Sequence, residues 1–469
     1  MPTPVVDLPA RWLPAPRRDA LPEPVALRRM LGPSVILVGL SIGSGEFVLW
    51  PRLTAEHGFA VFWACWVGVT MQFFLNMEIE RYTLATGESA VTGFLRLWRG
   101  FGWVFLVCAT LPWIWPGWAT GAATLVSWQW GGDATWLAVA GLVGCGVVLS
   151  VGPVVYRTIE TLQTVLVGAV FLLVLILSFF VIDAESVAAL AAGAVRFGHV
   201  PDGIELPVLL GALAFAGAGG SANLAQSNYI KDKGYGMGRY IGRITSPLTG
   251  RDEAETELGV AMEGSDEDLA RWRTWWRRAN LEHALSFYLL CLLSLVLFCL
   301  ITHALLGEGH GGGEGLGFIR DQADGLGERF GPSARHAYLW AGVAVLFSTE
   351  IGILDAVTRV AVDLLKVRWL LDDERFSPSR LYFAVLWSLI GFGVLVLAVG
   401  FERPFELIVL SASLNAFVMF LYSGLLLWLG LRVFRGPLRP GPVRIVALAA
   451  AFLFFGYFSL LTLADQLGG

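Results

Sequence analysis

The sequence predicts an all-α integral membrane protein that crosses the bilayer about eleven times. Of its 469 residues, 56% are hydrophobic and only 15% are charged, whereas a soluble globular chain carries roughly 25% charged residues. Apolar stretches of about 20 residues, the length that a helix needs to span a membrane, recur along the chain. The composition excludes an ordinary soluble domain, and the net charge of -5 gives no indication of a nucleic-acid partner.

Hydropathy divides the chain into a short N-terminal segment and one transmembrane domain. Residues 1–30 are rich in Pro and lack the apolar core of a cleavable signal, so we expect a flexible cytoplasmic tail. Residues 31–469 form the transmembrane domain. Its spans are expected near 33–56, 58–82, 101–126, 134–155, 158–182, 205–228, 281–306, 336–364, 380–400, 405–432 and 443–465.

The distribution of basic residues predicts the orientation in the membrane. Lys and Arg concentrate before span one and in the loops after spans two, four, six, eight and ten. By the positive-inside rule these alternate loops are cytoplasmic. The N-terminus is therefore expected inside and, with an odd number of spans, the C-terminus outside, in what we expect to be a bacterial inner membrane.

The loop after span six is a long cytoplasmic insertion, residues 229–280. Near its end, Ser265 and Asp268 have the spacing of a helix capping box. The Trp- and Arg-rich residues 269–278 predict a helix at the inner membrane surface. We interpret this helix mainly as a lead-in to span seven, with a partner-binding surface as the alternative.

Span one contains an interruption of its helical pattern near mid-membrane. Gly43, Ser44 and Gly45 weaken the helix, and Glu46 places a carboxylate at a depth where charge is costly. Unwinding there would expose main-chain carbonyl and N–H groups to a substrate. We therefore predict a binding site, while packing of small residues against a neighbouring helix is the structural alternative.

Span six contains a second interruption of the same kind. Gly217, Gly219 and Gly220 occupy three of four positions, and Ser221 and Asn223 follow. Spans one and six are corresponding helices of two five-span halves that enter the membrane from opposite sides. Paired interruptions in corresponding helices indicate the substrate site of an inverted-repeat transporter.

Other buried charges are candidates for binding a coupling ion, which we expect to be a proton or sodium. Asp355 and Arg359 in span eight are four residues apart and are expected to pair. Glu350 has no such partner and is the better candidate beside Glu46, with Asp355 as a third.

Polar and bulky side chains at two further depths are expected to shape the transport path. Span three must kink at its Trp-rich stretch 112–118, and span ten brings Ser411, Ser413 and Asn415 toward the site.

At the inner interface, the default interpretation of charged side chains is that they snorkel to the membrane surface. The alternative is a salt-bridge gate formed by Glu80, Arg81, Arg157 and Glu160.

An ordered set of short motifs carries a family resemblance. The motifs are Leu31–Gly32–Pro33 before span one, Gln72 with residues 79–88 around the end of span two, residues 157–160 at the start of span five, and Ser348–Thr349–Glu350 in span eight. In these motifs and in its span pattern the chain resembles the Nramp family of proton-coupled divalent-metal transporters. The resemblance covers most of the chain. It implies the LeuT fold of the APC superfamily, a 5+5 inverted repeat with an eleventh helix and discontinuous spans one and six.

The metal-binding motifs of that family are altered in this chain. The family's span-one Asp-Pro-Gly-Asn falls on residues 43–46, so Gly43 and Glu46 replace its two ligands. The span-six Met-Pro-His falls on residues 220–222, which removes the thioether that favours manganese and iron and the His associated with proton movement. Glu46 and Asn223, which offer hard oxygen atoms, are the remaining candidate metal ligands.

These features predict a secondary transporter without the usual preference for manganese or iron. The first hypothesis is a carrier of a hard or hydrated divalent cation, although one carboxylate is few for a 2+ ion. The second is a symporter of a small organic solute, bound by main-chain N–H groups after both interruptions. The third is a non-transporting membrane sensor whose 229–280 insertion binds a partner. No catalytic or phosphate-binding motif is present, so neither an enzyme nor a cofactor is expected.

Overall fold

The computed structural model describes residues 5–246, 258–310, 315–401 and 403–468, and a helix stands at each predicted span. The spans in order are α1, η2 and α2 (Pro33–Ser41, Ile42–Leu49 and Trp50–His57); α3 (Phe62–Thr86); α5, η3 and α6 (Phe101–Thr110, Leu111–Trp113 and Gly117–Trp130); α7 (Ala134–Val151); α8 (Val155–Val181); α10, η4 and α11 (Leu206–Ala214, Gly220–Ala225 and Gln226–Lys233); η6 and α13 (Ala284–Tyr288 and Leu289–Leu306); α15 (Pro332–Trp369); α16 (Pro378–Ala398); α17 (Pro404–Val433); and α18 (Pro442–Gly468). The other elements are β1 (Arg17–Asp19), η1 (Leu27–Arg29), α4 (Ala90–Leu97), α9 (Ala184–Ala194), η5 (Gly236–Tyr240), β2 (Val260–Met262), α12 (Asp266–His283), α14 (Gly317–Phe330) and η7 (Gly436–Leu438).

The chain is an integral membrane protein, because nine of its described helices are long and apolar enough to cross a bilayer. The two other predicted spans are α3 and span six. In α3, buried polar side chains such as Gln72 and Asn76 lower the hydropathy. Span six is divided into segments that are individually short.

The interruption of span one is a change in helix type. Its α-helix gives way at Ile42 to eight residues of π-helix and resumes at Trp50, whose N–H group donates to the main-chain oxygen of Gly45. The wider π-helical hydrogen-bonding pattern occurs in short stretches, often at functional sites. The predicted discontinuity is present, but the backbone remains helical through Gly43 and Gly45 instead of unwinding.

The interruption of span six is a true break. Helix α10 ends at Ala214, residues 215–219 have no helical structure, and a 3₁₀ turn leads into α11. Gly217, Gly219 and Gly220 adopt positive φ angles of 135°, 75° and 52°. Glycine adopts such angles without the steric cost that a Cβ atom imposes. The glycines therefore permit the predicted break.

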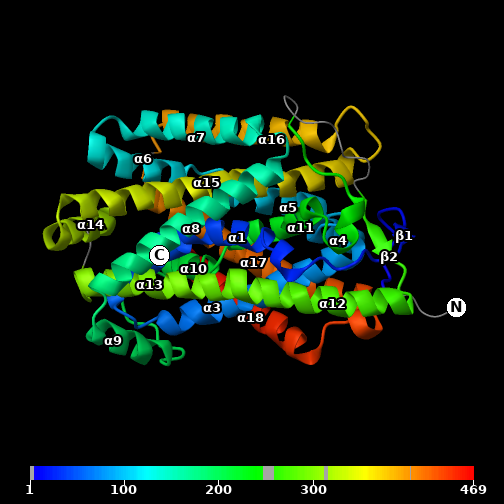
Figure 1. Cartoon of the computed structure of the whole chain (residues 1–469), viewed down its shortest axis with the longest axis horizontal. Helices are drawn as coiled ribbons and strands as arrows, with labels where there is room; N and C mark the ends of the chain where they lie inside the picture. Colours follow the sequence, from blue (N-terminus) through cyan, green and yellow to red (C-terminus); the bar gives the residue numbers. More distant parts are fainter. Residues whose placement is uncertain (1–4, 247–257, 311–314, 402, 469) are drawn as a thin grey trace.

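The two ends of the helical bundle carry different connecting elements. We call the end with β1, β2, α4 and the start of α12 the inner end, and the opposite end, toward which α9 and α14 extend, the outer end (Figure 1). Elements predicted to be cytoplasmic lie at the inner end, and α9 and α14 belong to loops predicted to be external. The 38-residue helix α15 runs between α6 and α8, with α7 and α16 packed together beyond it.

The N-terminal segment is packed against the inner end, so the expectation of a flexible tail is wrong for residues 5–30. Val6 and Leu21 are fully buried, and β1 pairs in parallel with β2 of the 229–280 insertion. Trp275 and Arg278 of α12 donate hydrogen bonds to the main-chain oxygens of Pro22 and Pro24. Extended, Pro-rich backbone leaves its carbonyl groups free to accept such bonds, which composition alone does not reveal.

The end of the insertion forms the helix that the sequence predicts. Ser265 and Asp268 make both hydrogen bonds of the capping box at the start of α12. Helix α12 then continues through the π-helical turn η6 into α13 without a break. The Trp- and Arg-rich stretch is therefore the inner extension of span seven.

Candidate functional site

Spans one and six meet at their interruptions. A Cβ atom on Gly45 would lie 1.6 Å from the main-chain oxygen of Phe215, the first residue after α10. A Cβ atom on Gly43 would lie 2.1 Å from the hydroxyl of Thr349 in span eight. Both glycines thus allow backbone contact that no larger residue permits. The small residues serve the packing role that was the structural alternative, and they also bring the two interruptions together.

Glu46 is buried beside this contact and faces span seven. Its Oε1 atom accepts a hydrogen bond of 2.6 Å from Ser41, and Cys291 and Ser294 of α13 lie beside the carboxylate. Its Oε2 atom has no hydrogen-bond partner among the described residues. The side chain of Ser44 lies outside the described part of the structure. Glu46 can therefore exchange a proton or bind a ligand through its unpaired oxygen.

Gln72 of α3 holds the broken part of span six. Its Nε2 atom donates to the main-chain oxygen of Ala214 at 2.8 Å, and its Oε1 atom accepts from the N–H group of Gly219 at 3.1 Å. It therefore replaces hydrogen bonds that the helix loses at the break. A Cβ atom on Gly217 would lie 2.5 Å from the same side-chain oxygen.

Ser221 and Asn223 follow the break and point into a polar cluster. Trp113 donates to the hydroxyl of Ser221 at 2.8 Å, and the N–H group of Ser221 donates to the side-chain oxygen of Asn415 at 3.2 Å. Asn223 donates to Gln72 at 3.2 Å and to the hydroxyl of Tyr422 at 3.0 Å. Spans two, three, six and ten thus meet at this cluster.

Aromatic rings cover the break in span six. The rings of Trp113 and Phe215 are stacked with centroids 5.5 Å apart, and Trp118 lies 5.5 Å from Trp113. The indole N–H group of Trp118 is buried without a partner among the described residues. Stacked rings beside amide and hydroxyl groups are the combination typical of sites for small organic molecules.

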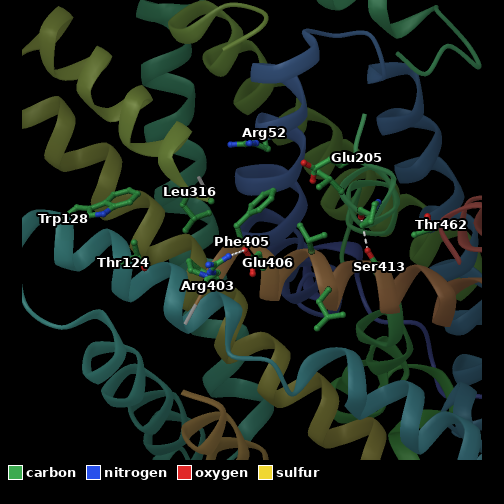
Figure 2. A pocket seen from close by; sticks show the side chains of 16 residues that line it. Arg52, Thr124, Trp128, Glu205, Leu316, Arg403, Phe405, Glu406, Ser413 and Thr462 are labelled. Atoms are coloured by element: carbon green, nitrogen blue, oxygen red, sulfur yellow. Dashed lines mark hydrogen bonds and ion pairs between the residues drawn. The ribbon is translucent and has the colours of Figure 1, made fainter. Parts of the chain in front are cut away.

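A cavity of about 980 Å³ opens at the outer end (Figure 2). Its lining residues come from α2, α6, α10, α17 and α18 and from residues 315–316 before α14. Figure 2 shows Ser413 beside α10, and the hydroxyl of Ser413 donates to the Pro207 oxygen at 3.0 Å. Arg52, six residues after Glu46, lines it too, so the cavity lies about 9 Å farther along the helix axis. Glu46, Ser221 and Asn223 are buried. We call this cavity, which lies on the outer side of these buried residues, the outer vestibule.

The other two coupling candidates, Glu350 and Asp355, have hydrogen-bond partners outside the polar cluster. Glu350 is buried in α15, where its Oε2 atom accepts from the N–H group of Ala119 at 3.2 Å. Asp355 pairs with Arg359 at 2.8 Å, as predicted, and accepts from the hydroxyl of Tyr382 at 2.6 Å. These bonds satisfy both carboxylate oxygens of Asp355, which favours a structural role.

The structure does not assemble the four residues of the predicted inner gate. Arg81 pairs with Glu78 on its own helix, Glu160 pairs with Lys233 of α11, and Arg157 is exposed. Glu80 is buried and bonded to Gln226. The sequence predicted only the positions of these residues along spans two and five, and a position along a helix does not determine which faces of separate helices meet.

The described residues contain no group of three or more His, Cys, Asp or Glu side chains that could hold a metal ion. Glu46 and Asn223, the two candidate ligands, belong to different surroundings, since Asn223 bonds Gln72 and Tyr422.

Sequence reasoning did not assign Gln72 or Tyr422 to the site. A mid-span Gln signals a buried polar contact, whereas a Tyr in an apolar helix carries no such signal.

No protein-family model and no curated protein sequence matches the chain, but solved structures do. A mutant of the manganese transporter of Eremococcus coleocola has a TM-score of 0.67 at 13% identity and covers 97% of this chain and 90% of its own. The same transporter in complex with an aromatic bis-isothiourea substituted compound has a TM-score of 0.61 at 13% identity, covering 96% and 90%.

A second transporter has a similar structure. MHP1, a nucleobase-cation-symport-1 family transporter in a closed conformation with bromovinylhydantoin bound, has a TM-score of 0.52 at 12% identity and covers 95% of both chains. Identities this low show the fold alone. The protein therefore has the LeuT fold, with interrupted spans one and six as predicted.

Proposed function

We propose that the protein is a secondary active transporter, distantly related to the Nramp carriers, whose substrate binds near mid-membrane between the interruptions of spans one and six. The observation that carries this proposal is the contact of Gly45 with Phe215 beside the buried, half-paired carboxylate of Glu46. Interrupted helices that meet at membrane depth are the usual setting of a substrate site in such folds. The outer vestibule supplies the entry path.

The site supports a small organic solute better than the divalent cation that the sequence favoured. The groups around the break in span six are neutral: amides of Gln72, Asn223 and Asn415, hydroxyls, and stacked aromatic rings. They can hydrogen-bond and stack on an uncharged or zwitterionic molecule. Glu46 then serves as the proton-accepting group of a symporter, since its carboxylate has a free oxygen in a buried setting.

A divalent cation is the second candidate, and the unpaired Oε2 atom of Glu46 is the observation that favours it. A hard divalent cation needs six or more oxygen ligands and commonly more than one carboxylate. Binding would therefore require main-chain oxygens from the interruption and several waters. A sensor is less well supported, because residues of α12 already bind the chain's own N-terminal segment.

Transport by purified protein in proteoliposomes tests the proposal. The liposomes are offered an inward proton gradient with a panel of radiolabelled amino acids, nucleobases and polyols, and separately with Mg²⁺ and Mn²⁺. We expect uptake of one organic solute that falls at least tenfold in Glu46→Gln while solute exchange persists. Glu185→Gln, on the exposed side of α9, is the matched control and should leave uptake unchanged.

Each alternative has its own result in this experiment. Uptake of Mg²⁺ or Mn²⁺ that is lost in Glu46→Gln would show that the substrate is a divalent cation and not an organic solute. Absence of uptake and exchange for every substrate, together with binding of a soluble protein to the inner end, would contradict transport and support the sensor.

A further inference from the structure

A row of polar side chains on α3 faces span six. Gln72, Asn76 and Glu80 are four residues apart and therefore lie on one side of the helix. Gln72 contacts Asn223 at 3.2 Å, and Glu80 accepts from the Nε2 atom of Gln226 at 3.2 Å. Asn76 lies one helical turn from each, so its side chain is directed into the same interface.

Several oxygen atoms in this interface have no hydrogen-bond partner in the described part of the chain. They belong to Asn76, Asn223 and Gln226, all of which are fully buried. The Nδ2 atom of Asn76 is unpartnered as well. Buried polar atoms in proteins are nearly always paired with protein, water or a bound ion. Three such oxygens within one interface indicate that it holds a water molecule or a cation that these oxygens coordinate.

Glu80 adds a buried carboxylate to these oxygens. It is 3% exposed, and no Lys or Arg forms an ion pair with it among the described residues. The side chains of Arg81 and Arg444 pair with Glu78 instead, at 2.8 and 3.1 Å. A buried charge without a counter-charge is costly. When Glu80 is ionised, the interface has one negative charge to balance and oxygens that can coordinate a cation that balances it.

We propose that this interface, formed by Asn76, Glu80, Asn223 and Gln226, is a binding site for a monovalent cation such as Na⁺. Hard cations prefer carboxylate and amide oxygens, and a single carboxylate neutralises a single positive charge. The site differs from the position of Glu46, which faces α13. An ion bound there links α3 to η4 and α11 just past the break. Its binding does not depend on which solute the protein carries.

Thermal unfolding of the purified full-length protein tests this site. The midpoint is measured in NaCl and in choline chloride at equal ionic strength, because a ligand that binds only the folded state raises it. We expect Na⁺ to raise the midpoint of the wild-type protein by a few degrees. Asn76→Leu and Glu80→Gln should each abolish the Na⁺-specific shift. Thr70→Val, on the same helix outside the interface, should retain it.

Direct binding of ²²Na⁺ completes the test, with one saturable ion per chain expected in the wild-type protein and none in Asn76→Leu. If Asn76→Leu does not fold, Gln226→Leu is measured instead, with the same expectation. No Na⁺-specific shift in the wild-type protein, or an undiminished shift in both Asn76→Leu and Glu80→Gln, would show that the interface holds water only. An equal shift in MgCl₂ at matched ionic strength would overturn the assignment to a monovalent ion.

Discussion

Arg359 of span eight is ion-paired with Asp232 of α11 at 2.5 Å, and it also pairs with Asp355 of its own helix at 2.8 Å. The hydroxyl of Tyr382 donates to Asp355, so span nine joins the same network. All of these side chains are nearly or fully buried. The inner half of span six is therefore fixed to spans eight and nine by charges that have little access to water.

Removal of Arg359 should destabilise the protein strongly. In Arg359→Met, two carboxylates remain buried without their counter-charge, and breaking a buried pair in this way costs about 3–5 kcal/mol. We expect a marked fall in the thermal unfolding midpoint of purified protein. Neutralising Asp232 and Asp355 to Asn in the same variant should restore much of it. Arg335→Met, which removes a partly exposed pair with Asp324, should change the midpoint little.

A methyl group at Gly45 should separate spans one and six. In Gly45→Ala the new carbon would lie 1.6 Å from the Phe215 oxygen, and that neighbour is backbone, which cannot rotate away. We expect loss of transport and a lower unfolding midpoint. Gly168→Ala in α8, where a Cβ atom meets nothing within 4 Å, is the control. Normal uptake by Gly45→Ala would show that the interruptions need not touch for transport.

Loss of the Gln72 side chain should disorder the break in span six. Gln72→Leu has a similar volume but frees the Ala214 oxygen and the Gly219 N–H group, at a cost of about 1–3 kcal/mol for each buried unpaired group. We expect faster hydrogen exchange in residues 214–223 than in the wild-type protein. Gln322→Leu, at a buried amide remote from the break, should leave that exchange unchanged. Equal exchange in both variants would show that Gln72 does not stabilise the break in span six.

The N-terminal segment should depend on Arg96. Burial disfavours the charge of this side chain, but the adjacent Glu88 carboxylate outweighs burial and raises the pKa of Arg96. The guanidinium group donates to the main-chain oxygens of Pro9 and Pro14. In Arg96→Gln we expect trypsin to cleave within residues 5–30 several times faster, as measured by mass spectrometry. The exposed neighbour Arg99→Gln should cleave at the wild-type rate.

Local sequence signals predicted the spans because hydropathy and chain length determine them within one segment. The interruptions, the capping box of Ser265 with Asp268 and the Asp355–Arg359 pair were predictable for the same reason. Each depends on residues a few positions apart. The number of spans and the spacing of the two interruptions predicted an inverted-repeat transporter, and the resemblance to the Nramp family implied the LeuT fold.

Contacts between distant segments were not predictable. The sequence analysis placed Asp232 near the start of the 229–280 insertion. In the structure, helix α11 extends through Asp232, whose side chain pairs with Arg359. The pairing of three-residue strands β1 and β2 joins segments more than 240 residues apart. Gln72 was noticed only as part of a motif, since nothing local shows that its amide reaches the backbone of span six.

The outer vestibule should admit substrate from the side of the membrane opposite the N-terminal segment. Val409 lines the vestibule from α17 and is partly buried, so a tryptophan there would occupy space between α17 and α10. In Val409→Trp we expect at least a tenfold loss of uptake from the outer side, with substrate binding to detergent-solubilised protein much less affected at equilibrium. Leu395→Trp, at a position of α16 that is 57% exposed, is the control for added bulk. Uptake by Val409→Trp at the rate of this control would show that substrate reaches Glu46 by another route.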